Sequence, residues 1–325
     1  MRIGRVHKLR RRVWGIALPV LALAAGLCVD AQPTARALPP LKRHPAVALT
    51  FDDVPAAGDL IPGQTRAGIA RQLTAVLKAH HLKGVYGFVI ASALEDDPDA
   101  QEALRIWVDE GMNIGNHTYS HPSLTDETAE AYKQDIARNE PALARYAKNR
   151  DWHWFRYPYL CEGDTLQKRH AVRNWLHAHG YRIAQVTLNF NDDDWDDAYG
   201  RCVVKHDDAA IGWLRQSYLE DAEQFIRVGR QEQQIVFGRE IPNVLLLHET
   251  AFTTLMLPEL LDLLRKQGFR FAPLAKVESD PAYAQDPDAA LKDGGPFLNQ
   301  FMNSRHLKYP PFKDEPEERL QNICR

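Results

Sequence analysis

The sequence predicts an α/β protein built on a parallel sheet, and two observations support this expectation. Short apolar runs with strand character alternate along the chain with longer segments whose apolar residues recur at helical spacing. Strands that alternate with helices in this way are joined by crossovers, which make neighbouring strands parallel. No internal repeat is visible in the sequence. The alternation alone leaves open whether the sheet is open or closed into a barrel.

Each apolar run has the features of a strand, and each longer segment has those of a helix. The first helical segment places Ile69, Leu73 and Leu77 on one face, and two later segments end at Gly111 and Gly180. The expected strands are residues 46–51, 84–90, 112–117, 153–159, 181–190, 243–249 and 269–274. The expected helices are residues 65–82, 97–111, 125–148 (with Thr125 as a candidate cap), 164–180, 206–235 and 254–268.

Composition limits the class of protein. The 325 residues are 45% hydrophobic and 26% charged, which is ordinary for a globular chain. The length fits one large α/β barrel or two smaller domains. Because the net charge is only −3, nothing favours nucleic acid or an anionic membrane as a general partner, and the sequence does not indicate an oligomeric state.

The first 31 residues have the layout of a secretory signal peptide. A basic start precedes an apolar run, Val13–Leu27, and small residues follow. The run is shorter than the roughly 20 residues that span a bilayer as a helix. We therefore expect cleavage after Ala31 or Ala37 and export to the periplasm or the medium, with no stable membrane span afterwards. A retained membrane anchor is the alternative.

The rest of the chain divides into three expected parts. Residues 32–45 are proline-rich and polar, as in a linker, and the strand and helix alternation occupies residues 46–277. Residues 278–325 are rich in proline, aspartate and glycine, and we expect them to form a tail that wraps the surface.

Polar side chains follow five of the expected strands, at the point where each strand ends. Functional groups of parallel α/β proteins gather at such positions, because the carboxyl ends of the strands meet on one face. Five clusters at strand ends are hard to explain as solvated loops alone. They are Asp52 and Asp53; His117 and His121; Arg156 and Tyr159; Asn191–Asp197, which includes Trp195; and His248.

The pair His117 and His121 suggests a metal site. Pro122 disfavours a helix at His121, so we expect both imidazoles in a turn. Two imidazoles and one carboxylate, with a position left for water, form a standard catalytic zinc arrangement. A dication would also offset the repulsion between Asp52 and Asp53, so that one could ligate and the other act as a base. Taken singly, these residues are as easily explained as surface histidines and a turn-forming aspartate pair.

Five motifs together resemble those of the polysaccharide deacetylases, the NodB-homology group known as carbohydrate esterase family 4. They are TFDD (Thr50–Asp53), HTYSHP (His117–Pro122), RYPY (Arg156–Tyr159), DDDW (Asp192–Trp195) and LLLH (Leu245–His248). The resemblance implies an irregular (β/α) barrel of about seven parallel strands, which would make residues 46–277 a catalytic domain. It also implies metal-dependent removal of N- or O-linked acetyl groups from a chitin-like, peptidoglycan-like or plant poly- or oligosaccharide.

The resemblance further implies a role for each matched residue. Asp53, His117 and His121 would bind a divalent metal, expected to be Zn²⁺, with Co²⁺ or Ni²⁺ as alternatives. Asp52 would be the catalytic base, held ionised by Arg156.

The remaining roles concern the leaving group and the substrate. His248 would be the general acid, and a neighbouring carboxylate would keep it protonated. We favour Asp192 for that carboxylate over Asp193 and Asp194. The residues in contact with substrate would be Tyr159, through a backbone N–H that stabilises the oxyanion, and Leu246 and Trp195, in the slot for the acetyl methyl.

Two departures from the family pattern bear on the substrate. Val54 stands where the family usually has glycine, and the fourth motif would begin at Asn191 in place of an acid. Two other functions therefore stay open: an amidohydrolase of the same fold acting on a non-sugar amide, and a non-catalytic glycan-binding homologue.

The cysteines allow at most one internal bridge once Cys28 leaves with the signal peptide. Cys161 and Cys202 follow the fourth and fifth expected strands, whose ends lie on the same face of a parallel barrel. We expect these two to be bridged and Cys324 to be free. Two buried free thiols are the alternative.

Overall fold

The computed structural model describes residues 45–325, except 56 and 314–315. The expected signal peptide, residues 1–31, and all but the last residue of the expected linker lie outside the described residues. Residues His44–Arg325 form one compact unit. Among the described helices, none is both long and apolar enough to cross a membrane.

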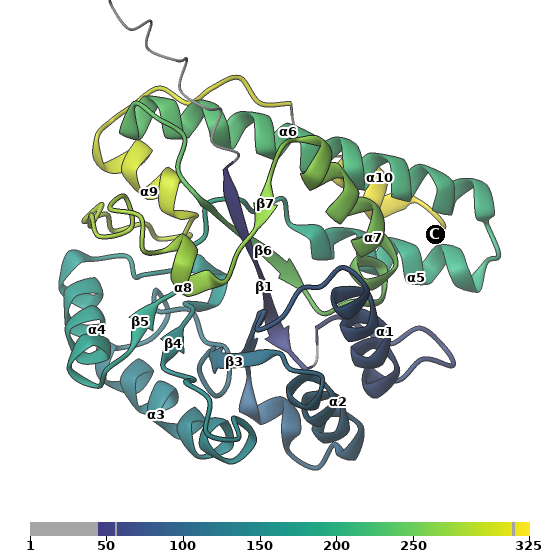
Figure 1. Ribbon diagram of the computed structural model, residues 1–325, viewed down its shortest axis with the longest axis horizontal. Coiled ribbons are helices and arrows are strands. Elements are labelled where there is room, and N and C mark those ends of the chain that lie inside the picture. The colour runs from purple at the N-terminus through teal and green to yellow at the C-terminus, as the bar shows by residue number, and fades with distance from the viewer. Residues whose placement is uncertain (1–44, 56, 314–315) are drawn as a thin grey trace, which may run out of the picture. The chain divides into compact units, whose positions relative to one another are not determined.

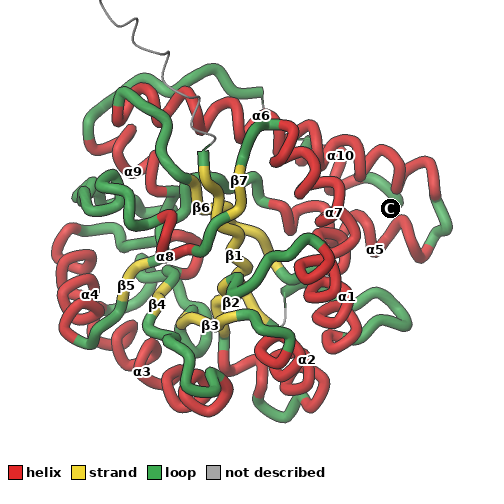
Figure 2. Tube along the Cα trace, viewed as in Figure 1, coloured by secondary structure: helices red, strands yellow, loops and turns green. Residues whose placement is uncertain are grey.

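The described residues contain one sheet of seven parallel strands, which confirms the predicted fold class. Six strands follow the order β5-β4-β3-β2-β1-β6, and β7 pairs with the start of β1. Figure 2 shows the strands in the centre of this unit with helices around them. The strands are β1 (Ala46–Val54), β2 (Tyr86–Val89), β3 (Asn113–Asn116), β4 (Trp154–Phe155), β5 (Arg182–Ile183), β6 (Asn243–His248) and β7 (Arg270–Phe271).

An isolated bridge closes the sheet into an irregular barrel. Leu188, five residues beyond β5, pairs in parallel with Leu245 of β6. The backbone N–H of Leu188 donates to Val244 and that of Leu246 donates back to Leu188, each at 3.0 Å. Only Arg182–Ile183 of the expected strand 181–190 is regular, because the chain pairs first with β4 and then crosses to β6.

The central strand β1 positions the two adjacent carboxylates. Asp52 lies opposite His248 in the register with β6. The register against β2 shifts between Phe51 and Val54, and Asp53 has a left-handed φ of 58°. This irregularity leaves Asp52 buried inside the barrel and turns Asp53 toward the rim.

The described helices surround the sheet, and most begin with a side-chain cap (Figure 1). Thr65, Asp97, Thr165 and Thr250 each accept a hydrogen bond from a backbone N–H of the following turn. The α-helices are α1 (Arg66–Ala79), α2 (Pro98–Asp109), α3 (Ala129–Tyr146), α4 (Leu166–Ala178), α5 (Asp196–Val204), α6 (Asp208–Phe237), α7 (Ala251–Lys266), α8 (Leu274–Val277), α9 (Phe297–Ser304) and α10 (Glu317–Asn322). The 3-10 turns are η1 (Ala91–Leu94), η2 (Pro158–Leu160) and η3 (Asp192–Trp195).

Thr125 does not cap α3. Thr128 does so, by accepting from the backbone of Ala131 at 3.1 Å. The Thr125 hydroxyl instead donates to the carbonyl of Lys292 at 2.6 Å, and it therefore holds a tail segment that sequence periodicity could not place.

The tail, residues 278–325, packs into the same compact unit. Phe297, Phe301 and Met302 of α9 are buried with Val236 near the end of α6. Figure 1 shows α9 and α10 in yellow, next to α6 and α5 respectively. The tail therefore contributes core contacts as well as surface cover.

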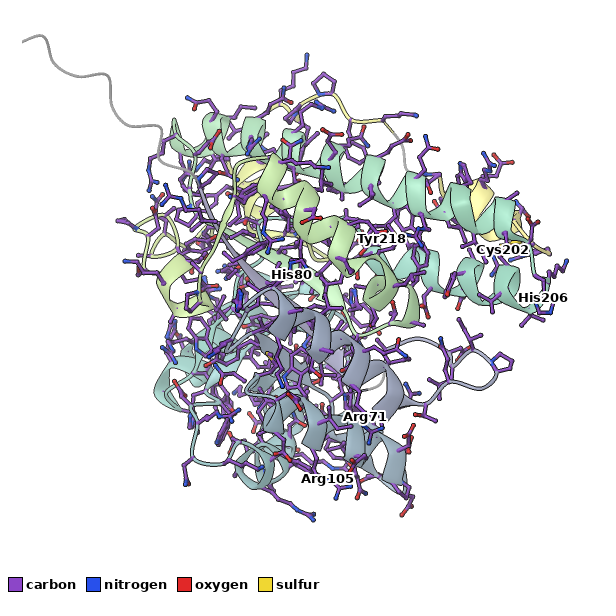
Figure 3. The ribbon with its side chains drawn as sticks, turned by 45° about the vertical axis from the view of Figure 1, so that its right-hand side comes forward. Arg71, His80, Arg105, Cys202, His206 and Tyr218 are labelled. Atoms are coloured by element: carbon purple, nitrogen blue, oxygen red, sulfur yellow. A yellow bond between two sulfur atoms is a disulfide. The ribbon has the colours of Figure 1, made fainter. Side chains whose placement is uncertain are left out.

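The predicted disulfide is wrong. The structure pairs Cys202 with Cys324, with Cα atoms 5.1 Å apart, and leaves Cys161 free and buried. Cys202 lies within α5, not in a loop, and Arg201 beside it donates to the carbonyl of Leu320 at 2.6 Å, so α5 faces the C-terminal segment (Figure 3). The expectation failed because the tail could not be placed from sequence.

Replacing Cys324 by serine should lower the free energy of unfolding by about 2–4 kcal/mol, because the bridge closes a long loop in the unfolded chain. Denaturant titration in non-reducing buffer measures the loss. As a control, Cys161→Ala should keep the Cys202–Cys324 peptide in an unreduced digest. A linked Cys161–Cys202 peptide in the native protein would contradict the assignment.

Candidate active site

A cavity of about 370 Å³ opens at the carboxyl ends of β1, β3 and β6. It collects most of the residues expected from the motifs and several that were not expected. The lining residues are Asp52, Asp53, His117, His121, Tyr159, Leu160, Asn189, Asn191, Asp193, Leu246, His248, Asp293, Gly295 and Pro296.

Asp52 and Arg156 form a buried ion pair at the base of the cavity. Arg156 Nη1 donates to both oxygens of Asp52, at 2.9 and 3.1 Å. The other guanidinium nitrogens donate to Thr50 Oγ1 at 3.1 Å and to the carbonyl of Ala184 at 2.8 Å. Each side chain is almost fully buried, so the pair depends on these hydrogen bonds to offset desolvation.

Three side chains converge beside this pair: Asp53, His117 and His121. We call them the metal triad because they are the residues expected to bind a metal. One ligand atom from each lies within 4.8 Å of the others. Asp53 Oδ1 lies 3.4 Å from His117 Nε2 and 3.2 Å from His121 Nε2, and this buried oxygen has no hydrogen-bond partner. An orphaned carboxylate oxygen facing two imidazole nitrogens is what a missing cation would leave.

The protonation of the triad also fits a metal. His117 Nδ1 lies 2.8 Å from the carbonyl of Arg156, so an N–H there leaves the Nε2 lone pair facing Asp53. Burial, assisted by the charge of His117, lowers the pKa of His121 to about 4. Neutral imidazoles are the form that binds metal, and two nitrogens with one oxygen suit Zn²⁺.

The turn that carries both histidines is held by local hydrogen bonds. Thr118 and His121 have left-handed φ values of 66° and 57°. Thr118 Oγ1 accepts from the His121 backbone at 3.0 Å, and Asn116 Oδ1 accepts from the Thr118 backbone at 2.9 Å. The pair therefore lies in a turn and not on a helix, as Pro122 predicted.

His248 is held on another side of the cavity by Asp192. Asp192 Oδ1 lies 2.9 Å from His248 Nδ1, and Oδ2 accepts from the His248 backbone at 2.9 Å. Thr253 Oγ1 also donates to Asp192, at 2.6 Å. Burial by itself would lower the pKa of His248, but the charges of Asp192 and Asp193 outweigh it and hold that pKa well above the usual value.

Two of the expected substrate contacts reach the cavity. Leu246 lines it, and Tyr159 lies at its rim with its ring centroid 4.5 Å from that of His121. Trp195 does not line it: the indole is fully buried and donates to Ser217 Oγ at 2.9 Å. The 3-10 turn η3 places Asp192 toward His248 and Trp195 toward the core. The expected role of Trp195 in a slot for the acetyl methyl stays a prediction.

The tail supplies cavity residues that the motifs did not reveal. The segment Asp293–Pro296, which we call the strap, lies against the turn η2. Gly295 donates to the carbonyl of Leu160 at 3.2 Å, and a Cβ on Gly294 would lie 2.4 Å from the carbonyl oxygen of Tyr159. The paired glycines in the sequence were the available signal, because such pairs mark close backbone approach.

A buried ionic cluster anchors the segment that leads into the strap. Arg169, which is fully buried, lies 2.6 Å from Asp286 and 3.2 Å from Glu162. Arg173 also pairs with Glu162, at 2.6 Å. Glu162 follows η2 closely, so one cluster ties the tail and the loop after β4 together.

Comparison with known proteins relates part of this chain to a family. Residues 41–184 match the family model described as polysaccharide deacetylase. A peptidoglycan-N-acetylglucosamine deacetylase of Bacillus cereus is 30% identical over 143 residues, which is 44% of this chain and 44% of that protein. A peptidoglycan-N-acetylmuramic acid deacetylase of Bacillus subtilis is 33% identical over 69 residues, 21% of this chain and 25% of that protein. This chain therefore spans less than half the length of these curated relatives. Residues 41–184 therefore match the polysaccharide deacetylase family, in agreement with the resemblance of the motifs.

The solved structures that match this chain are less similar to it in sequence than these curated relatives are. The chitin deacetylase of the fungal pathogen Colletotrichum lindemuthianum is 20% identical and covers 72% of this chain and 88% of that one, with a TM-score of 0.49. A polysaccharide deacetylase of Bacillus cereus is 19% identical over 70% of this chain and 91% of that one, with a TM-score of 0.48.

Gly294→Ala should loosen η2, because its Cβ would collide with the backbone at Tyr159. Overpacking of this kind typically costs about 1–3 kcal/mol. Gly180→Ala is the matched control, since Gly180 has a similar φ of 78° and open space around it. Hydrogen exchange should rise at residues 158–161 in the first variant only. Equal exchange there in both variants would show that the strap does not support η2.

Asp192→Asn should lower the pKa of His248 strongly, because burial then acts with less opposing charge. In the native protein, stability from protonated His248 is fully present below about pH 6.5 and is lost as pH rises through its raised pKa. NMR titration of the metal-free protein measures the shift. Asp197→Asn, which removes an exposed carboxylate of the same segment, should leave the His248 pKa nearly unchanged. An unshifted His248 in Asp192→Asn would contradict the assignment.

Proposed function

We propose that this chain is an exported, divalent-metal-dependent deacetylase that removes acetyl groups from an acetylated hexosamine polymer of the peptidoglycan or chitin type. The observation that carries the proposal is the meeting of three groups in one cavity. These are the metal triad, the Asp52–Arg156 ion pair and the Asp192–His248 pair.

The first half of the reaction needs an activated water near a base. When bound, a divalent ion supplies Lewis acidity and lowers the pKa of water. Asp52 Oδ2 lies 3.7 Å from His117 Nε2, so it is near enough to the triad to take a proton from an attacking water. Arg156 fixes the orientation of this carboxylate through two hydrogen bonds.

The second half needs a proton for the leaving nitrogen. His248 carries one at neutral pH because its pKa is raised, and Asp192 occupies its Nδ1. The ring would therefore donate from Nε2, and the departing group would leave as an amine with acetate as the other product.

The remaining groups would hold the acetyl unit in place. The backbone N–H of Tyr159 would donate to the developing oxyanion, and Leu246 would pack against the methyl group. The Tyr159 ring, 62% exposed at the rim, would pack against the sugar.

The substrate class and export are supported by the relatives and by the N-terminal sequence. The matched proteins of Bacillus are peptidoglycan deacetylases by name. A basic, then apolar, then small-residue N-terminus would direct the chain across the membrane to such a polymer. Protein recovered from its native host should then begin at Gln32 or at Leu38.

Acetate release from a panel of substrates tests the proposal. Purified protein should release acetate from N-acetylated chitin oligomers or peptidoglycan, lose this activity to a chelator and regain it with Zn²⁺. Release that is insensitive to chelation would overturn the metal role. Release only from a non-sugar acetamide would favour the amidohydrolase reading, and binding of glycan without release would favour the non-catalytic one.

Two neighbouring substitutions in the same assay separate the roles of the carboxylates. Asp52→Asn should bind zinc normally and lose about 10²–10⁴-fold in acetate release, the usual worth of a general base. Asp53→Ala should weaken zinc binding. Asp59→Asn, at an exposed carboxylate of the following loop, is the control for charge removal. Exchanged phenotypes would reverse the assignment.

A further inference from the structure

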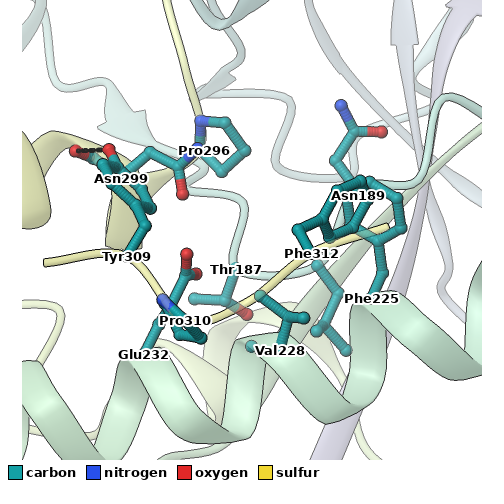
Figure 4. Close-up of a pocket in the computed structure, with 12 residues that line it drawn as sticks. Thr187, Asn189, Phe225, Val228, Glu232, Pro296, Asn299, Tyr309, Pro310 and Phe312 are labelled. Carbon is teal, nitrogen blue, oxygen red and sulfur yellow. Dashed lines mark hydrogen bonds between the residues drawn. The ribbon is translucent and has the colours of Figure 1, made fainter. Parts of the chain in front are cut away.

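A second cavity of about 320 Å³ adjoins the active site, between α6 and the tail (Figure 4). It shares two lining residues, Asn189 and Pro296, with the catalytic cavity. The two cavities are therefore neighbours. Both of its main walls, α6 and the tail, lie beyond residues 41–184, the part of the chain that matches the family model.

The walls of this cavity are mostly apolar and aromatic. Phe225 of α6 and Phe312 of the tail pack edge to face, with ring centroids 4.8 Å apart. Tyr309 and Pro310 of the tail complete that side. Aromatic faces favour flat apolar surfaces and also attract cations.

One acidic side chain enters this apolar space. Glu232 of α6 is 7% exposed, and Figure 4 shows its carboxylate pointing between Tyr309 and Pro296. Among the described residues, none makes a hydrogen bond or an ion pair with this carboxylate, and no lysine, arginine or histidine lines the cavity. Burial raises the pKa of Glu232 to about 7, and its charge contributes to raising the pKa of nearby Tyr309.

A carboxylate without a partner in this largely enclosed, mostly apolar cavity is costly to ionise, and a cation brought by a ligand would relieve that cost. Hydrolysis of an N-acetyl group yields an amine, which takes a proton and becomes an ammonium. The product of the proposed reaction thus carries a positive charge that can pair with the Glu232 carboxylate. The sugar ring that bears this charge can pack against the aromatic walls. A fully acetylated unit carries no such charge.

We propose that this second cavity binds a deacetylated, ammonium-bearing hexosamine unit of the same polymer whose acetylated unit occupies the catalytic cavity. The proposal rests on the proposed function and deepens it. The enzyme would then act preferentially beside a unit that has already lost its acetyl group. Glu232 is the specificity-determining residue in this arrangement.

Calorimetric binding of two oligomers of equal length tests the inference: a glucosamine tetramer and an N-acetylglucosamine tetramer, each with the zinc-loaded protein. Glu232→Gln should weaken binding of the glucosamine tetramer by about tenfold or more, as expected for loss of a charge-assisted contact. Binding of the acetylated tetramer should stay unchanged. Glu223→Gln, the same change on the exposed face of α6, is the matched control and should alter neither.

Two further measurements keep the outcome decisive. If Glu232→Gln does not fold, Phe312→Ala takes its place in the test. This substitution changes a partly exposed residue of the cavity wall and should also weaken glucosamine binding. Acetate release from an acetylated dimer, too short to fill both cavities, should be equal in native and Glu232→Gln proteins. Equal glucosamine binding by native and Glu232→Gln proteins would overturn the inference. Absence of acetate release from any oligomer would overturn the proposed function alone, because the binding comparison does not depend on turnover.

Discussion

The buried ion pair between Asp52 and Arg156 fixes the geometry on which the site depends. Through one guanidinium it joins the end of β1, the end of β4 and the segment after β5. Removing one partner of such a pair typically costs about 3–5 kcal/mol, whereas apolar replacement of both is often neutral. Stability alone therefore does not account for the pair. The pair also fixes the orientation of a carboxylate next to the metal triad.

Two histidines of one cavity are driven to opposite protonation states. Both are largely enclosed, and burial by itself disfavours the charged ring in each. At His121 burial, assisted by His117, outweighs the opposing charge of Asp53 and lowers the pKa, while at His248 the charges of Asp192 and Asp193 outweigh burial and raise it. Groups whose pKa values are pushed apart in this way can act as ligand and acid side by side.

The sequence predicted the parts of the fold and site that depend on local order. Strand and helix alternation placed Asp52, His117 and His248 at strand ends, and a parallel sheet brings such ends together. Contacts made by the tail could not be predicted, because they join residues far apart in the sequence without periodicity. The pairing of Cys202 with Cys324 belongs to this class. The full burial of Trp195 could not be predicted for a different reason, since the direction of a side chain within a 3-10 turn is set by the core around it.

The strap gives the order of residues along the chain a consequence for synthesis. All of the motif residues precede residue 249, yet the cavity also needs the segment Asp293–Pro296. When His248 has just been synthesised, the growing chain already contains all of the motif residues. The strap, which lines one part of the cavity, has not yet been made. The anchors at Asp286, the turn against η2 and the wall at Pro296 arrive only as translation continues. Enclosure of the site is thus a late event in the making of the protein, separated in time from the appearance of its reactive groups.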